Sequence, residues 1–159
     1  MRIVAIATFA ATFAAGAPAF TPTDVVTRDG AALYDAGASG DEGRVVATLP
    51  YWTAVRAEPY PSQSPKTYGH AALADGREGD MEWDDLGRIL VVGEAGATIY
   101  ERPDASSAEL ARVQAGAWLA EVRVVHAEQE GKWREVMTAA GDHGWVAWEA
   151  AAAPAADGR

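Results

Sequence analysis

The residue types that commonly carry catalysis are few and isolated in this chain of 159 residues. The only imidazoles are His70, His126 and His143, and none of them belongs to a recognisable catalytic motif. His143 stands beside Asp142 in a glycine-flanked segment, which is typical of a solvated turn. The sequence contains no HExxH zinc motif, no GxSxG nucleophile elbow and no GxxxxGK[ST] phosphate loop. We therefore predict that the protein is not an enzyme.

Cysteine and metal chemistry are not indicated either. The absence of cysteine excludes thiolate nucleophiles, thiolate metal sites and a disulfide framework. Acids are paired at Asp84-Asp85 and at Glu128 and Glu130, but such neighbours are usually surface charge. No calcium-loop spacing is present. The sequence predicts no metal site and no cofactor.

Aromatic side chains are the remaining candidates, as core residues or as a binding surface. The chain has six tryptophans and five tyrosines. Trp133 and Trp145 alternate with polar neighbours, so we expect them to face inward, each burying roughly 150–250 Å². The aromatics assigned to the core are Trp133, Trp145, Trp83 and Tyr34.

Other aromatics are predicted to form a shallow groove in the C-terminal half. Trp148 lies three residues after Trp145 on an expected extended segment, so the two side chains should point to opposite faces. Tyr100 precedes a loop at the lip where small barrels bind ligands. Packing against the N-terminal half is the alternative role for these aromatics. The groove hypothesis uses Tyr100, Trp118 and Trp148, with Glu101, Arg102 and Asp142 as polar contacts at its edge.

The elements that would position these residues read as short strands. In residues 131–150, the alternation of Trp133 to Val136 and the extended pattern from Trp145 flank a glycine-bracketed turn, which favours a β-hairpin. The C-terminal half also shows strand patterns over 89–92, 97–100, 109–113 and 117–125, with turn signals between them. Five or six short strands of this kind predict a small barrel or sandwich.

An internal repeat extends this pattern to the N-terminal half. Val25 to Tyr34 lies 66 positions before Val91 to Tyr100, and five of the ten positions are identical. Further matches follow at offsets of 64 and 65, such as Trp83 with Trp148. An ordered series of matches indicates two tandem modules. We assign residues 20–86 and 87–150 to them, and 151–159 to a disordered tail.

Residues 89–150 resemble the bacterial SH3 (SH3b) domain family. The resemblance is carried by Gly96 to Val113, where a strand leads into a Pro-plus-Ser loop and a second strand, and by two Trp-bearing closing strands at 133–136 and 144–146. Residues 25–86 share it only through the internal match. In this copy Asp80 stands in place of Trp145, Gly37 in place of Pro103, and Trp52 in place of the turn glycine Gly116. The resemblance implies an all-β fold of two tandem small SH3-like barrels, the first divergent.

The N-terminus has the form of a secretory signal peptide. A positive start at Arg2 precedes an apolar run from Ile3 to Ala15, and small residues lead up to Ala19. The run is shorter than the roughly 20 residues that span a bilayer. We predict cleavage after Ala19, export to the periplasm or the exterior, and no membrane span in the mature chain. An uncleaved membrane anchor is the alternative.

The net charge of the chain excludes some classes of binding partner. The net charge is −10, and removing residues 1–19 takes away one arginine and no acid, which makes it −11. A chain this acidic has no electrostatic attraction to nucleic acid or to anionic lipid surfaces. The SH3b resemblance implies a non-catalytic binding protein of the bacterial cell envelope whose ligand is peptidoglycan or a short peptide. The alternative is an adaptor or accessory subunit of an envelope complex, and a cell-wall hydrolase ranks last.

Overall fold

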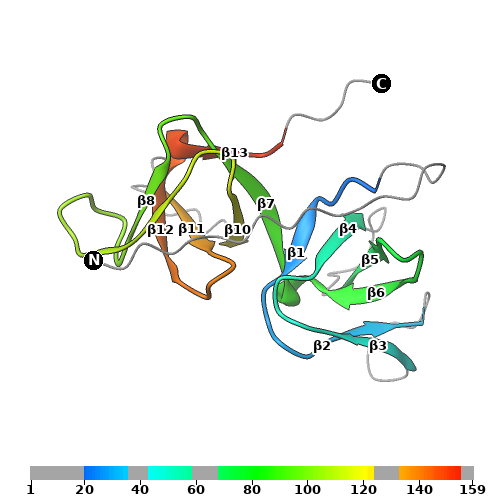
Figure 1. The fold of residues 1–159 in the computed structure, drawn as a ribbon. Coiled ribbons are helices and arrows are strands. Elements are labelled where there is room, and N and C mark those ends of the chain that lie inside the picture. The colour runs from blue at the N-terminus through cyan, green and yellow to red at the C-terminus, as the bar shows by residue number, and fades with distance from the viewer. Residues whose placement is uncertain (1–19, 36–42, 59–67, 124–132, 155–159) are drawn as a thin grey trace. The chain divides into compact units, whose positions relative to one another are not determined.

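The computed structural model describes residues 20–35, 43–58, 68–123 and 133–154 (Figure 1). These residues form β-strands and two single-turn 3₁₀ helices, with no α-helix among them. The prediction of an all-β fold is therefore confirmed. No helix within the described ranges is both long enough and apolar enough to cross a membrane. The predicted signal peptide, residues 1–19, lies outside the described residues.

The chain divides into two compact units between Gly87 and Arg88. In the first unit the antiparallel strands follow the order β3-β2-β6-β5-β4-β1. A 3₁₀ turn, η1 (Trp83–Asp85), follows β6. The strands are β1 (Asp24–Val26), β2 (Ala31–Tyr34), β3 (Val45–Leu49), β4 (Ala54–Glu58), β5 (Tyr68–Leu73) and β6 (Glu78–Glu82).

The second unit has the strand order β7-β10-β11-β12-β8-β9. The turn η2 (Trp148–Ala150) follows β12, and a last short strand pairs with β7. The strands are β7 (Leu86–Val92), whose first two residues belong to the first unit, β8 (Ala97–Tyr100), β9 (Glu109–Val113), β10 (Trp118–Arg123), β11 (Trp133–Met137), β12 (His143–Ala147) and β13 (Ala151–Ala152).

The two units repeat one strand connectivity, because β1 to β6 pair with each other as β7 to β12 do. The register repeats as well. Tyr34 opposes Asp80 in the first unit, and Tyr100 opposes Trp145 in the second. Each β2–β3 or β8–β9 pair even has a register shift at the same place, before the tyrosine. The internal repeat found in the sequence thus corresponds to a repeated strand topology.

Equivalent turns also share their backbone conformation, with one exception in residue type. The turn before β10 has Gly116 at φ 76°, and its N–H donates to the carbonyl of Val92 at 2.9 Å. The turn before β4 has Trp52 at φ 66°, and its N–H donates to the carbonyl of Val26 at 2.8 Å. Because only glycine adopts a positive φ without steric cost, the first unit carries backbone strain at Trp52.

Each unit has its own apolar core, made of aliphatic side chains. Two glycines let a strand approach closely: a Cβ at Gly79 would meet the carbonyl oxygen of Tyr34, and one at Gly144 would meet that of Tyr100. The first core includes Val26, Leu33, Leu49, Val55, Ala71, Met81 and Leu86. The second includes Leu90, Val92, Ile99, Val113, Leu119, Val136, Val146 and Ala151.

Three of the aromatics assigned to the core lie elsewhere. Trp133 and Trp145 are only half-buried. Val136 on β11 and Val146 on β12 face the core. Each tryptophan lies an odd number of residues from the buried valine of its own strand, so its indole points to the other face. Tyr34 is likewise half-buried on the face opposite Leu33. Trp83 is partly buried and packs against the first core. The sequence showed the alternation, but the choice of inward phase was wrong.

The predicted tail also needs a correction. Ala151 and Ala152 form β13, and Ala151 is 2% exposed in the second core. The two residues pair with Val92 and Val91, which gives the end of the chain a place in the sheet. Alanine is small enough to pack here, although an alanine-rich composition had suggested a frayed segment. Residues 155–159 lie outside the described residues.

Candidate functional site

The most exposed tryptophan of the chain's described part is held in a fixed position. Trp148 opens η2 and is 44% exposed. The guanidinium of Arg134, on β11, lies 3.4 Å from the centroid of its indole. A cation over the face of an indole is attracted by the ring quadrupole. One face of Trp148 is therefore covered by Arg134, and the rest of the indole is presented to solvent.

Arg134 is itself anchored inside the second unit. Its Nη1 donates to Oε1 of Glu121 at 2.6 Å, and the two side chains are 12% and 6% exposed. Arg134 and Glu121 lie on the core-facing side of their strands, in phase with Val136 and Leu119. The buried Nε of Arg134 has no hydrogen-bond partner among the described residues. Glu121, Arg134 and Trp148 thus form a connected cluster, which we call the Trp148 cluster.

The first unit shows what happens without the arginine. At the equivalent positions, Gly69 replaces Arg134 and Trp83 replaces Trp148. The ring of Trp83 lies so close to Gly69 that a Cβ there would overlap it. Trp83 then packs against the first core. The side chain at this position and the packing of the indole thus differ together between the two units, and the offset of 65 in the sequence could have revealed the difference.

A second aromatic group lies on the other face of the second sheet. Tyr100 on β8 and Trp133 on β11 meet edge to face, with centroids 5.6 Å apart and planes at 90°. Trp145 on β12 opposes Tyr100 in the ladder. All three point away from the face that carries Ile99, Val136 and Val146. We call this group, together with the adjacent Glu135, the outer aromatic face.

Sequence reasoning missed a polar contact on the outer aromatic face. His143 begins β12 rather than lying in a solvated turn, and its Nε2 is 2.8 Å from Oε1 of Glu135. Glu135 directly opposes Trp145, and His143 opposes Met137. The contact is diagonal across two strands, so it becomes visible only once the register is known.

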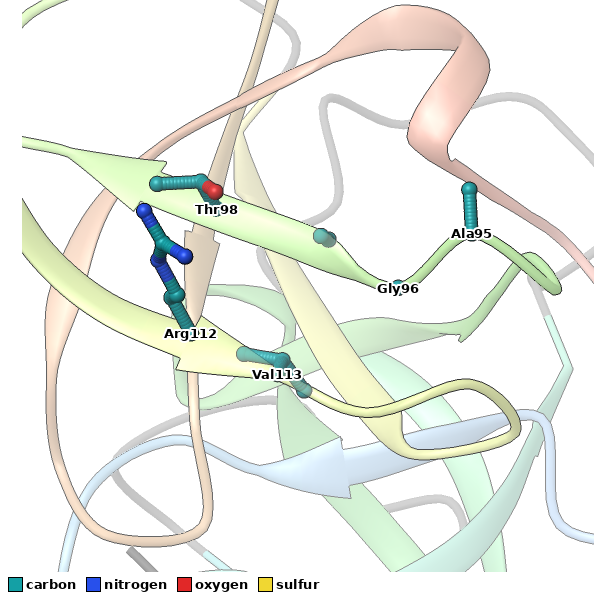
Figure 2. Close-up of a pocket in the computed structure, with 6 residues that line it drawn as sticks. Ala95, Gly96, Thr98, Arg112 and Val113 are labelled. Carbon is teal, nitrogen blue, oxygen red and sulfur yellow. The ribbon is translucent and has the colours of Figure 1, made fainter. Parts of the chain in front are cut away.

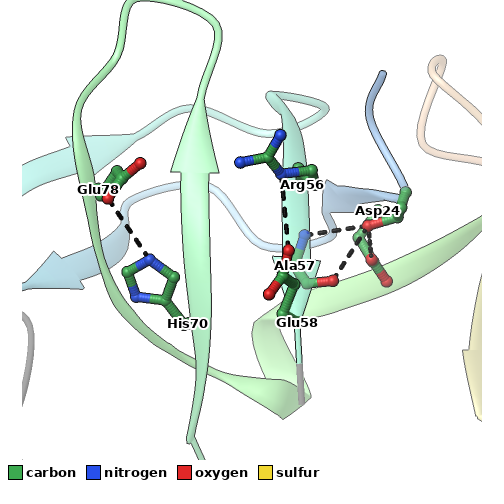
Figure 3. Close-up of polar contacts among 7 residues, drawn as sticks. Asp24, Arg56, Ala57, Glu58, His70 and Glu78 are labelled. Atoms are coloured by element: carbon green, nitrogen blue, oxygen red, sulfur yellow. Dashed lines mark hydrogen bonds and ion pairs between the residues drawn. The ribbon is translucent and has the colours of Figure 1, made fainter. Parts of the chain in front are cut away.

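The first unit contains the same contact with the residue types exchanged. His70 on β5 takes the place of Glu135, and Glu78 on β6 takes the place of His143 (Figure 3). The distance from His70 Nε2 to Glu78 Oε2 is 3.7 Å. His70 Nδ1 is also 3.6 Å from Oδ1 of the buried Asp80. Tyr34 and Tyr68 repeat the edge-to-face pair at 6.0 Å and 78°.

The predicted groove residues are not brought together. Tyr100 contacts Trp133, whereas Trp148 contacts Arg134, whose side chain lies on the opposite face of the sheet. Trp118 is 39% exposed on β10, and β11 and β12 separate that strand from β8 in the sheet order. The prediction that Trp148 is exposed agrees with the structure, but the reason is Arg134 and η2 rather than strand alternation.

The polar residues assigned to the groove stabilise loops. The N–H of Arg102 donates to Oγ of Ser107 at 3.3 Å, and the exposed Glu101 bonds through its main chain to Ala108. Asp142 accepts a hydrogen bond from the hydroxyl of Thr138 at 3.1 Å within the β11–β12 turn. In the same loop as Arg102, the backbone N–H and the hydroxyl of Ser106 lower the pKa of Asp104.

A shallow hollow of about 190 Å³ lies between the start of β8 and the end of β9 (Figure 2). Thr98 and Arg112 oppose each other across the ladder and border it. The guanidinium of Arg112 is bound to Glu109, with the shortest contact at 3.0 Å. None of the aromatics lines the hollow. Within the described ranges, no three His, Asp or Glu side chains are grouped as a metal site would require.

Comparisons with known proteins assign the chain to no family. No protein-family model matches the sequence, and no curated protein matches it. Among solved structures, the chain is similar to NlpC2 from Trichomonas vaginalis at 15% identity and a TM-score of 0.35, over 87% of this chain and 51% of that one. It is similar to NlpC1 from the same organism at 15% identity and a TM-score of 0.33, over 86% and 48%. The chain thus spans about half the length of each.

Proposed function

We propose that this chain is a non-catalytic, exported binding protein of the bacterial cell envelope, and that its second unit recognises peptidoglycan. The observation that carries the proposal is the Trp148 cluster, an exposed indole held in place by a buried ion pair. The two units would be tandem SH3b-like modules, in keeping with the resemblance of residues 89–150 and with the repeated strand order.

The geometry of the Trp148 cluster suits recognition by stacking. Arg134 covers one face of the indole and leaves the rest of the 44% exposed side chain for a ligand. A sugar ring or a peptide plane can stack on such a surface, and because the indole is already ordered, binding costs less conformational entropy. The cluster contains no nucleophile, and its one carboxylate is bound to Arg134.

The first unit differs from the second at the position of the exposed indole. Its indole, Trp83, is packed on Gly69 and the first core and does not offer the same surface. We therefore assign ligand binding at this position to the second unit alone. One shallow surface should bind weakly, with no gain in avidity from the other unit at the same position.

Co-sedimentation with purified peptidoglycan sacculi tests the proposal. The full chain is expected to pellet with the sacculi, and Trp148→Ala is expected to lose at least about tenfold of this retention, which corresponds to about 1.4 kcal/mol. Leu110→Ala is the matched control, because Leu110 is 45% exposed in the same unit and on another strand.

Equal retention of Trp148→Ala and the unchanged chain would contradict the proposed site. Failure of the unchanged chain to pellet, together with recovery of one defined envelope protein in a pulldown, would replace peptidoglycan by a protein partner. Circular dichroism of each variant shows whether the β fold is kept.

A further inference from the structure

We infer that the outer aromatic face of the second unit is a separate binding site for an alkylammonium group, such as a lysine-type side chain. The site consists of Tyr100, Trp133, Trp145 and Glu135. It goes beyond the proposed function, because these side chains lie on the face opposite that of Arg134 and share no residue with the Trp148 cluster.

The rings provide the first part of the argument. Tyr100 and Trp133 stand at 90° with centroids 5.6 Å apart, so they form two walls rather than a flat stack. Trp145 continues the surface beside Tyr100 on the next strand. Ring faces carry negative electrostatic potential and attract cations, and tryptophan does so most strongly. All three are half-buried, which fixes their positions and leaves part of each surface open.

A carboxylate provides the second part. Glu135 lies two residues after Trp133 on the same face of β11 and directly opposes Trp145. Within the described residues, its hydrogen bond engages Oε1 with His143 and leaves Oε2 for a ligand. An ammonium group over the rings would therefore meet a carboxylate oxygen as well as the π-faces.

The surrounding charge favours a cation over other ligands. The chain carries a net charge of −10, which attracts cations and repels anionic groups. The cation on β9 that lies on this side of the sheet, Arg112, is held by Glu109 at 3.0 Å. An amine gains charge attraction from Glu135 in addition to the ring faces, which a neutral ligand does not and an acidic ligand opposes.

The first unit lacks the complete set and serves as an internal comparison. It keeps an edge-to-face pair, Tyr34 with Tyr68, but has His70 where the second unit has Glu135. Asp80 replaces Trp145 and is only 2% exposed. The indole is therefore missing, and the exposed carboxylate of this face, Glu78, stands at the position of His143 rather than of Glu135. We assign ammonium binding to the second unit, which has the complete set.

Nuclear magnetic resonance of the ¹⁵N-labelled full chain tests this site. The probe is n-butylammonium chloride at constant ionic strength, and n-butanol is the neutral control of the same shape. The indole N–H signals of Trp133 and Trp145 are expected to shift and to saturate with a Kd of about 1–30 mM. Shifts of the same size with n-butanol, or no saturable shift at these signals up to about 100 mM probe, would overturn the proposal.

Variants localise the effect. Glu135→Gln is expected to raise the Kd at least about threefold, whereas Glu94→Gln, which changes the net charge equally at an exposed turn, should leave it unchanged. Trp145→Asp introduces the residue that the first unit has at this position, and it should abolish saturation at Trp133. Equal Kd values for the two glutamine variants would contradict the assignment. The probe contains neither sugar nor peptide, so its failure would leave sacculus binding through Trp148 unaffected.

Discussion

Arg134 is the residue on which the difference between the two units depends most directly. It sits where the first unit has Gly69, binds Glu121 at 2.6 Å, and stacks on Trp148. A buried ion pair adds little to stability relative to apolar residues, but removal of one partner leaves an uncompensated charge. The pair is therefore better explained as a support for Trp148 than as a source of stability.

A double-mutant cycle tests this role of Arg134. Arg134→Leu alone should lower the free energy of unfolding by about 3–5 kcal/mol, because Glu121 would remain buried without a partner. Arg134→Leu combined with Glu121→Leu should recover most of that loss. Urea denaturation measures both variants. A double variant no more stable than the single one would show that the charge of Glu121 is not the cause.

Asp85 in η1 gives a prediction on pH. It is 3% exposed, and burial raises the pKa of its carboxyl although Arg28, at 2.8 Å, opposes this change. The native state thus keeps the proton to a higher pH than the unfolded chain. This group's contribution to the free energy of unfolding is complete below its unfolded pKa, near 3.8, and is lost as pH rises through the raised pKa.

Asp85→Asn removes this titration. The free energy of unfolding of the variant, relative to the unchanged chain, should increase as pH rises from about 4 toward neutrality. Urea denaturation of both proteins at several pH values measures this difference. Other carboxyls, such as Asp75 and Asp104, have lowered pKa values and the opposite effect, but they contribute equally to both proteins and drop out of the difference. A difference that stays constant or falls over this range would contradict the explanation.

At the scale of elements, the turns before β4 and β10 separate what the fold requires from what one unit adds. Both turns place a residue at positive φ and bond it to the first strand of their unit. The second unit uses Gly116, for which an added Cβ would meet nothing within 4 Å. The first unit uses Trp52, whose ring lies 5.6 Å from that of Tyr51. We therefore attribute the cost at Trp52 to its own backbone conformation rather than to crowding by other elements.

Two variants of Trp52 isolate that strain. Trp52→Gly and Trp52→Ala both remove the indole, but only alanine keeps a Cβ at φ 66°. Trp52→Gly should be more stable than Trp52→Ala by about 1 kcal/mol, after the entropy of glycine in the unfolded chain is allowed for. Thermal or urea denaturation gives the comparison. Equal stabilities would mean that the turn relaxes away from positive φ.

For the whole molecule, the sequence predicted the all-β class, and its internal repeat matches the repeated strand topology. The repeat could be recognised because the segments Val25 to Tyr34 and Val91 to Tyr100, which lead from the first strand of each unit into the second, share five identical residues. The inward phase of β11 and β12 could not be derived from alternation alone. Large aromatics such as Trp133 were expected inside, but the core is filled by aliphatic residues such as Val136. Alternation fixes the period of a strand and leaves open which face is buried.

The candidate site was harder to predict, because it depends on contacts between strands. The approach of His143 to Glu135 and the stacking of Arg134 on Trp148 both require the register of β11 or the position of η2. The two copies, aligned at an offset of 65, did contain usable signals: Arg134 is aligned with Gly69, and Glu135 is aligned with His70. An internal comparison of this kind, applied to polar positions as well as aromatic ones, would have indicated both surfaces.

We propose that the molecule binds the cell wall without cleaving it. The most direct measurement incubates the full chain with purified sacculi, then determines in one sample the protein retained in the pellet and the soluble fragments released. We predict saturable retention that depends on Trp148, with fragment release no greater than from sacculi alone. Release of fragments in proportion to added protein, or no retention at any concentration, would contradict the claim.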